Sequence, residues 1–124
     1  MADVKTEVLA ANEAFYRAMR HGDLAAMDLL WSEARDVSCA HPGRALLHGR
    51  GPVLESWRLI FEGGGPPEIE VDGVHAVVTG GTALVLCVEV VAGARLTATN
   101  AFALEDGRWR LVSHLSAEMP EAAG

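Results

Sequence analysis

Apolar residues near the start of the chain recur with the spacing of a helix. Five of them are three or four positions apart and so share one helix face: Val4, Val8, Ala11, Phe15 and Ala18. We expect this helix to end at His21-Gly22, because glycine readily adopts the left-handed conformation that follows a last helical turn. The N-terminal segment is therefore predicted to be an amphipathic helix.

Two more helices are predicted before residue 68. Asp23 stands at the N-cap position of the first, which carries the apolar residues Leu24, Met27, Leu30 and Trp31. The other begins at Gly51-Pro52, since proline is favoured at the first helical position, and the run from Gly63 to Pro67 ends it. Its apolar stripe consists of Val53, Trp57, Ile60 and Phe61.

From residue 68 onward the pattern changes to the period of two that strands show. Residues 68–72 alternate polar and apolar side chains, and residues 95–104 do so again. Residues 83–91 form a nearly continuous apolar run, typical of a central strand, and a last strand is expected over residues 108–115. Helices followed by strands with short hairpin links predict an α+β domain, with an antiparallel sheet covered by helices on one side.

The turn at residues 105–107 determines which side chains of the last two strands face each other. A three-residue turn with a left-handed glycine, which we favour, pairs Asn100 with Val112 and places Asn100 and His114 on one face. A two-residue turn pairs Asn100 with Ser113 and sends His114 to the opposite face, because a shift of one residue exchanges the faces.

Length, charge and cysteine content limit the number of domains, the kinds of partner and the compartment that we expect. The chain has 124 residues, the length of one domain, and its apolar content of 50% suffices for a packed core. A net charge of −7 argues against a nucleic-acid partner, which requires a basic face. No stretch approaches about 20 consecutive apolar residues and no secretory signal is visible, so we expect no membrane partner. Two cysteines, Cys39 and Cys87, fit a reducing compartment and predict a cytoplasmic protein.

An ordered set of motifs resembles a known family. Its N-terminal part comprises Phe15-Tyr16-Arg17-Ala18, Gly22-Asp23-Leu24, Trp31, Cys39-Ala40-His41-Pro42-Gly43 and Gly49-Arg50. Its C-terminal part comprises Thr99-Asn100-Ala101-Phe102, residues 106–112 and His114. These motifs resemble the SnoaL-like group of the nuclear transport factor 2-like superfamily, and the resemblance covers roughly residues 5–116.

The resemblance implies a cone-shaped fold, in which a strongly curved antiparallel sheet wraps around three N-terminal helices. It also implies a pocket inside the cone for a small apolar or aromatic molecule, and a homodimer formed through the outer face of the sheet. Ketosteroid isomerase, of the same superfamily, has a catalytic aspartate before a proline and two oxyanion donors, a tyrosine and an aspartic acid. This chain has His41-Pro42, Phe15 and Asn100 at those places, which argues against steroid-type isomerisation.

Three side chains are candidate catalytic groups. His41 can transfer a proton at neutral pH, since the pKa of imidazole is about 6.5, or it can simply pack and bond to the backbone. Asn100 can donate to a ligand carbonyl, or it can bond to a neighbouring side chain such as His41 or His114. His114 can be a second acid/base group or the orienting partner of His41, or it can lie at the surface.

The candidate ligand-binding residues are mostly aromatic: Phe15, Tyr16, Trp57, Phe61, Phe102 and Val112. In relatives the position of Trp57 faces the pocket, so its ring can form a wall for a flat ligand. The Tyr16 hydroxyl can replace the missing oxyanion donor, although we favour its exposure to water. Glu89 interrupts an apolar strand and faces solvent in the favoured interpretation; in the alternative it is buried beside a cation or a histidine, with a shifted pKa.

No metal or other cofactor is expected, because Cys39 and His41 have no second pair of ligands at zinc spacing and no phosphate-binding glycine loop is present. Two functions remain open. The first is a cofactor-independent isomerase, cyclase or lyase in which His41 moves a proton on an apolar carbonyl compound, while Asn100, His114 or Tyr16 polarises the oxygen. The second is a non-catalytic ligand-binding or dimeric scaffold protein.

Overall fold

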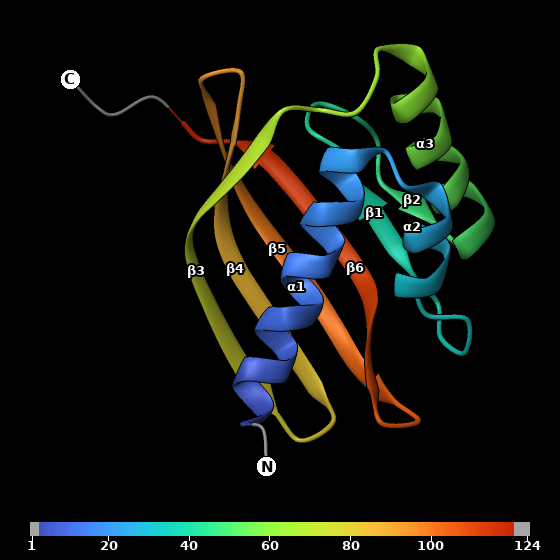
Figure 1. Ribbon diagram of the computed structural model, residues 1–124, viewed down its shortest axis with the longest axis vertical. Coiled ribbons are helices and arrows are strands. Elements are labelled where there is room, and N and C mark those ends of the chain that lie inside the picture. The colour runs from blue at the N-terminus through green and yellow to red at the C-terminus, as the bar shows by residue number, and fades with distance from the viewer. Residues whose placement is uncertain (1–2, 121–124) are drawn as a thin grey trace.

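The computed structural model describes residues 3–120, which form an α+β domain as the sequence predicts (Figure 1). The helices are α1 (Val4–His21), α2 (Leu24–Leu30) and α3 (Arg50–Gly63). The strands are β1 (Ser38–Ala40), β2 (Leu47–His48), β3 (Ile69–Thr79), β4 (Thr82–Val91), β5 (Ala94–Glu105) and β6 (Arg108–Glu118). Within residues 3–120, no helix is long and apolar enough to cross a membrane.

The helix boundaries follow local signals in the sequence. Gly22 ends α1 with a left-handed φ of 59°, and the Asp23 side chain caps α2 by accepting a hydrogen bond from the Ala26 amide at 3.0 Å. Helix α3 begins at Arg50, so Pro52 is its third residue and not its first. This difference is small in energy, because the first four amides of a helix have no intrahelical acceptor to lose.

The six strands form one mixed sheet in the order β2-β1-β6-β5-β4-β3. Strand β1 pairs parallel to β6, with Ser38 beside Ser113, so the expectation of a wholly antiparallel sheet is wrong at this pairing. No hairpin joins these two strands, and therefore no turn fixes their relative direction. Strands β1 and β2 have three and two residues, too few to show an alternating pattern in the sequence.

The hairpin between β5 and β6 has a two-residue turn. Glu105 pairs with Arg108, and the residues between them, Asp106 and Gly107, have φ values of 49° and 77°. Two consecutive positive φ angles are typical of a type I′ turn, whose twist matches that of the flanking strands. The favoured three-residue turn is therefore wrong.

A β-bulge nevertheless brings the two candidate side chains to one face. Ala101 pairs with Ser113, and Val112 is an extra residue on β6 at the point where the register shifts. Beyond this bulge Asn100 pairs directly with His114, and both side chains are buried. The prediction that Asn100 and His114 share a face is confirmed, whereas the predicted pairing of Asn100 with Val112 is wrong.

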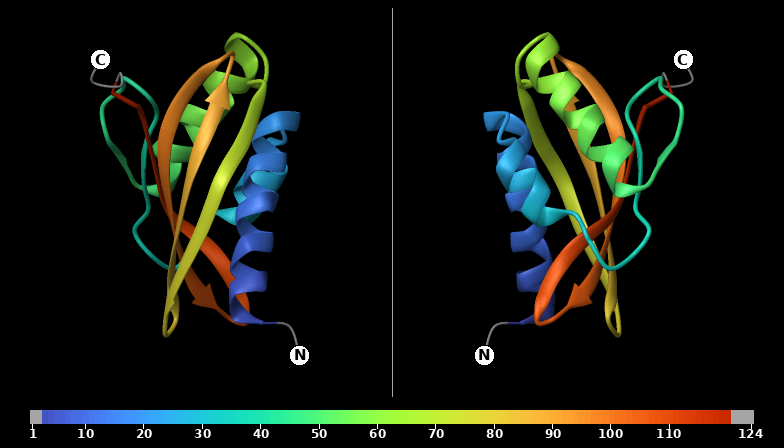
Figure 2. Two further views of the ribbon diagram at one scale, coloured as in Figure 1. Left: turned by 90° about the vertical axis from the view of Figure 1, so that its left-hand side faces the viewer. Right: turned by 90° about the vertical axis from the view of Figure 1, so that its right-hand side faces the viewer.

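One face of the sheet packs against helices, and no helix within residues 3–120 covers the other face. Helix α1 runs along the covered face in both side views (Figure 2), where Val85 and Glu89 of β4 are buried. On the opposite face Leu84 and Leu86 are 45% and 41% exposed. We call this side the outer sheet face, and define it by the cross-strand neighbours Val77, Leu84, Leu86, Thr99 and Leu115.

Candidate functional site

A pocket of about 280 Å³ opens between the helices and the covered face of the sheet. Its walls are mostly apolar: Met19, Pro42, Trp57, Ile60, Pro67, Ile69, Val91 and Leu96. Four polar side chains also line it: His41, Arg44, Glu89 and His114. Apolar walls with a few convergent polar groups are typical of small-molecule sites.

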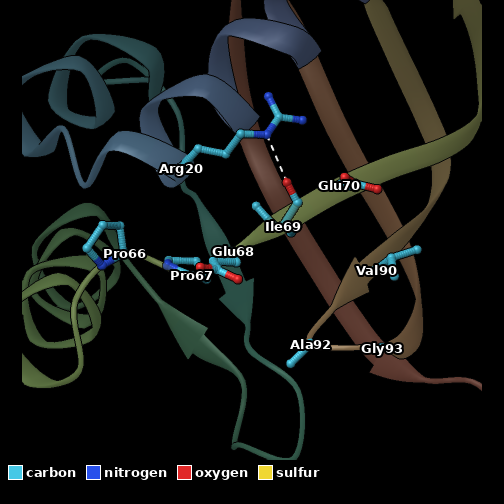
Figure 3. A pocket seen from close by; sticks show the side chains of 9 residues that line it. All are labelled: Arg20, Pro66, Pro67, Glu68, Ile69, Glu70, Val90, Ala92 and Gly93. Carbon is cyan, nitrogen blue, oxygen red and sulfur yellow. Dashed lines mark hydrogen bonds between the residues drawn. The ribbon is translucent and has the colours of Figure 1, made fainter.

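A larger hollow of about 750 Å³ lies beside this pocket, between the end of α1, the start of β3 and the β4–β5 turn (Figure 3). It shares Pro67 and Ile69 with the smaller pocket. Its one cation, Arg20, donates to the Ile69 carbonyl at 2.9 Å and also pairs with Glu13. None of its lining groups is a buried acid or base, so we place the candidate site in the smaller pocket.

His41 follows β1 and is 6% exposed. Its Nε2 lies 2.8 Å from the Ser56 hydroxyl of α3, and the ring packs edge-on against Trp57 with centroids 4.7 Å apart. Burial, helped by the positive charge of Arg44, lowers the pKa of His41 to about 4. The imidazole is therefore neutral at pH 7, the form in which it can accept a proton.

His114 and Asn100 are joined by a short hydrogen bond of 2.6 Å between His114 Nδ1 and Asn100 Oδ1. The Asn100 amide nitrogen donates to Asn12 Oδ1 at 2.9 Å and to the Tyr16 hydroxyl at 3.0 Å. Burial, together with the nearby His41, lowers the pKa of His114 to about 3. Asn100 is expected from the sequence either to donate to a ligand carbonyl or to bond to a neighbouring side chain. The structure shows the second arrangement, a hydrogen bond to His114.

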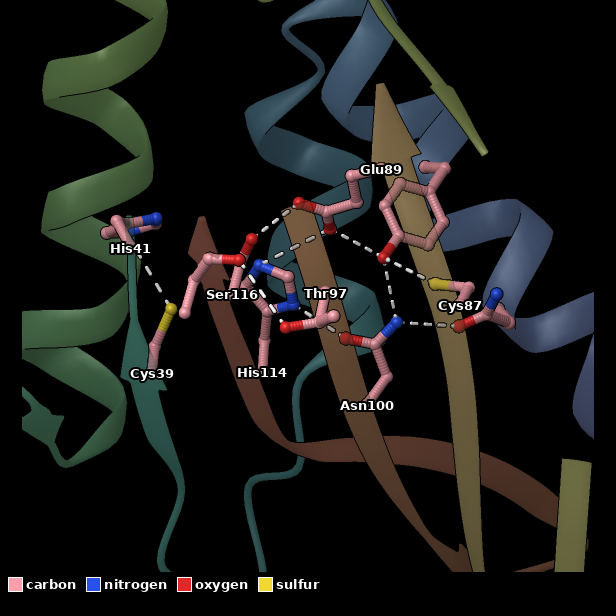
Figure 4. A network of polar contacts seen from close by, with 11 residues as sticks. Cys39, His41, Cys87, Glu89, Thr97, Asn100, His114 and Ser116 are labelled. Carbon is pink, nitrogen blue, oxygen red and sulfur yellow. Dashed lines mark hydrogen bonds and ion pairs between the residues drawn. The ribbon is translucent and has the colours of Figure 1, made fainter. Parts of the chain in front are cut away.

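Glu89 is 3% exposed, so the favoured interpretation of it as a solvent-facing residue is wrong. Its carboxylate accepts hydrogen bonds from the Tyr16 hydroxyl at 2.6 Å and the Ser116 hydroxyl at 2.7 Å, and His114 Nε2 lies 3.9 Å away. Figure 4 shows Glu89, Ser116, His114 and Asn100 directed toward one another. Burial raises the pKa of Glu89, and the hydrogen bonds from Tyr16 and Ser116 oppose that rise.

Tyr16 is fully buried, so its expected exposure to water is also wrong. Its hydroxyl lies between Glu89 and Asn100, with the Cys87 sulfur 3.3 Å away. Burial and the Glu89 charge raise the pKa of Tyr16 far above its ordinary value. The phenol therefore stays protonated and serves as a hydrogen-bond donor inside the protein.

The structure brings three of the predicted site residues to the pocket wall, His41, Trp57 and His114. The other aromatic candidates lie outside the pocket lining. Phe15 packs behind the wall, with its ring centroid 5.7 Å from Trp57 and 5.0 Å from His114. Phe61, half-buried, neighbours Trp57 at 5.9 Å, whereas Phe102 lies in the core and Val112 at the bulge.

Sequence reasoning missed Asn12 and Ser116 and misplaced Glu89. Asn12 is four residues from Tyr16 on α1, so helical spacing could have put it on the buried face. Glu89 is in phase with the buried Val85 of β4, a signal that the surrounding apolar run obscures.

The described side chains favour neither a metal site nor a cysteine nucleophile at this pocket. Among residues 3–120, no group of three or more His, Cys, Asp or Glu side chains could hold a metal ion. Cys39 and Cys87 are free and buried, and burial raises the pKa of both thiols. They are therefore protonated at neutral pH, which disfavours them as nucleophiles.

This fold and pocket define an α+β protein in which buried acid/base groups line a mostly apolar cavity. The profile of the SnoaL-like domain matches residues 8–120, and the chain belongs to that family. The fold is that of the nuclear transport factor 2-like (NTF2-like) proteins. It resembles a "putative dehydratase" of the NTF2-like family from Streptomyces avermitilis, with 36% identity and a TM-score of 0.87, covering 94% of this chain and 96% of that one.

Two further relatives are named as an association domain and as an F-box protein. A "putative calcium/calmodulin-dependent protein kinase type II association domain" from Thiobacillus denitrificans is 31% identical, with a TM-score of 0.80, over 90% of this chain and 94% of that one. The F-box protein SKIP8 of Arabidopsis thaliana is 30% identical over 114 residues. The match covers 90% of this chain but only 49% of the length of SKIP8.

Proposed function

We propose that the protein is a cofactor-independent acid/base enzyme, of the isomerase, cyclase or lyase kind, acting on a small apolar carbonyl compound. The observation that carries this proposal is the convergence of His41, Glu89 and His114 on one mostly apolar pocket. Each of these groups is buried and has a shifted pKa, which is costly to the fold and common at catalytic sites.

His41 is the proposed base. It is neutral at pH 7 and can take a proton from the carbon beside the carbonyl, which leaves an enolate. The imidazolium then returns that proton. Return to another carbon completes an isomerisation, whereas return to a hydroxyl on the next carbon breaks the C–O bond and releases water. The description of the Streptomyces relative as a "putative dehydratase" favours the second outcome.

Turnover of β-hydroxy carbonyl compounds with apolar side chains tests this proposal, since loss of water produces a conjugated product that absorbs in the ultraviolet. Replacing His41 or His114 with asparagine should lower the rate by about 100-fold or more, the usual contribution of a general acid or base. The control is His21→Asn, the same change at an exposed position at the end of α1, outside both the pocket lining and the outer sheet face, which should leave the rate unaltered. Equal rates in all four proteins would contradict a role for the pocket histidines.

A second candidate function is a ligand-binding or scaffold role in a homodimer. It is supported by the outer sheet face, where apolar side chains of β3, β4 and β6 stay exposed on either side of Thr99 of β5. The name of the Thiobacillus relative, an association domain, fits such a role. Binding of the same compounds to the wild type without turnover would favour this candidate.

A further inference from the structure

A directed chain of hydrogen bonds links Glu89 to His114. It passes through two side chains, with Glu89 Oε2 2.6 Å from the Tyr16 hydroxyl, that hydroxyl 3.0 Å from Asn100 Nδ2, and Asn100 Oδ1 2.6 Å from His114 Nδ1. All four residues are buried, so water does not compete for these contacts. The position of each proton along this chain of hydrogen bonds follows in turn, starting from the Glu89 carboxylate.

The carboxylate of Glu89 can only accept, so the single proton of the Tyr16 hydroxyl points to it. The Tyr16 oxygen must then accept from its other neighbour, which fixes the nitrogen of the Asn100 amide on the Tyr16 side. The bond from the same nitrogen to Asn12 Oδ1 agrees with this orientation. Asn100 therefore turns its oxygen toward His114.

An amide oxygen cannot donate, so the proton in the bond between His114 and Asn100 belongs to His114 Nδ1. A neutral imidazole carries only one N–H, which leaves Nε2 with a free lone pair. Among residues 3–120, no side chain or backbone group donates a hydrogen bond to His114 Nε2, and its charged neighbour Glu89 Oε2 lies 3.9 Å away. His114 and Glu89 both line the pocket.

The tautomer of His41, the other histidine of the pocket, is determined in a similar way. The Ser56 hydroxyl donates to the Val53 carbonyl at 2.6 Å, so its oxygen accepts from His41 Nε2. The other ring nitrogen, His41 Nδ1, then holds the lone pair. Both imidazoles of the pocket thus offer a hydrogen-bond acceptor and no spare N–H.

We infer that Glu89, acting through Tyr16 and Asn100, holds His114 as its Nδ1–H tautomer, and that the pocket therefore binds a ligand that donates a hydroxyl proton to His114 Nε2. Glu89, Tyr16 and Asn100 are positioning residues in this arrangement. A neutral hydroxyl suits the site better than a cation, because Arg44 also lines the pocket and two hydroxyls already bond to the Glu89 charge. The inference rests on the proposed function only in taking this pocket as the ligand site.

The tautomer is measured by two-bond ¹H–¹⁵N correlation spectra of protein labelled with ¹⁵N-histidine. The wild type should show a single Nδ1–H form at His114. Tyr16→Phe cuts the chain while keeping the ring, so that Asn100 keeps only its bond to Asn12, whose own amide can turn over, and a mixture of tautomers should result. Glu89→Gln, whose amide can donate, should shift the population toward Nε2–H. Ser116→Ala removes the other hydroxyl on Glu89, outside the chain, and should keep the wild-type tautomer.

An Nε2–H form in the wild type would overturn the inference even if no variant folds, and so would a Tyr16→Phe spectrum that matches the spectrum of Ser116→Ala.

The second part of the inference, that the ligand donates a hydroxyl proton to His114 Nε2, is tested with phenol and anisole. Phenol has a hydroxyl proton, and anisole carries a methyl group in its place. Phenol should move the ¹⁵N resonance of His114 Nε2, and anisole should not; equal effects, or none from phenol, contradict the hydroxyl requirement. If these tests succeed but no compound is turned over, the inference stands and the enzymatic proposal fails.

Discussion

Glu89 is a carboxylate in a strand of apolar residues, and its burial is tolerated because two hydroxyls donate to it. The pattern of the sequence shows the acid but not its partners, because Tyr16 and Ser116 come from α1 and β6. His41, Trp57 and His114 were found from the sequence because they are polar or aromatic residues within recognisable motifs. Glu89 and Asn12 needed knowledge of which faces meet in space.

Removal of the Tyr16 hydroxyl should destabilise the protein. Tyr16→Phe leaves one Glu89 oxygen without its donor and one Asn100 hydrogen without its acceptor, so we expect a loss of about 1–3 kcal/mol in the free energy of unfolding. Urea unfolding measures this loss. Thr79→Val removes an exposed hydroxyl at the end of β3 and should change the stability by less than about 0.5 kcal/mol. A loss for Tyr16→Phe no larger than for this control would contradict the assigned network.

The two pocket histidines should make the fold sensitive to acid. Their pKa values are lowered in the folded state, to about 4 for His41 and about 3 for His114, so the unfolded chain binds protons that the folded chain does not. This contribution to stability is complete above about pH 6.5 and is lost progressively as the pH falls through about 4, the pKa of His41, toward about 3, the pKa of His114.

The check is urea unfolding of His41→Gln at several pH values between 7 and 4. This variant lacks one of the two groups, so its stability should fall less steeply with acid than that of the wild type. The raised pKa of Glu89 has the opposite effect on stability in acid. Glu89 is present in both proteins, so this effect cancels in the comparison. His21→Gln, at an exposed position away from the pocket and the outer sheet face, is the control and should keep the wild-type slope. Parallel curves for all three proteins would show that His41 does not titrate as assigned.

At the scale of elements, the β5–β6 hairpin shows what a pattern can and cannot predict. Both strands and the place of the turn between them follow from their residues, whereas the length of the turn does not, because the favoured three-residue turn is in fact the two-residue turn Asp106-Gly107. The bulge at Val112 does not, because an extra residue in one strand leaves no mark in the alternation of its partner. The favoured turn and the observed turn plus bulge place His114 on the same face, and only the pairing in space distinguishes them.

Gly107 is the position in this hairpin where a side chain should cost most. Its φ of 77° lies in the left-handed region, so Gly107→Ala should lower the free energy of unfolding by about 1–2 kcal/mol. Gly81→Ala, in the β3–β4 turn, is the matched control, because Gly81 has no positive φ and an added Cβ meets nothing within 4 Å. Thermal unfolding of both variants provides the measurement, and equal losses would contradict the turn geometry.

At the scale of the whole molecule, the order of helices and strands and the family were predictable, because they rest on long patterns and an ordered set of motifs. The mixed sheet was not, since β1 and β2 are short and join the sheet far from their neighbours in sequence. The outer sheet face was predictable only in part. The apolar run of β4 indicated a strand with neighbouring strands on both sides. It did not indicate that Leu84 and Leu86 would stay uncovered.

The proposed homodimer can be broken at this face. Leu86 lies within the outer sheet face, opposite Thr99 of β5, so Leu86→Lys should place a charge inside the interface and give a monomer. Leu59→Lys is the control, since Leu59 is an exposed leucine of α3, away from the sheet. Sedimentation velocity distinguishes the two states. A wild type that sediments as a monomer, or a Leu86→Lys dimer as tight as the control, would refute the proposed interface.

The parallel contact of β1 with β6 has a consequence for how the molecule is made. Ser38 and Ser113 bond to each other across 75 residues of chain, so the strand that leads into His41 leaves the ribosome long before its partner does. The hairpins of β3, β4, β5 and β6 close over short loops and can form first, whereas β1 has to wait for the final strand. The pocket therefore cannot form before the final strand has been made, and a nascent chain carries His41 well before it carries His114.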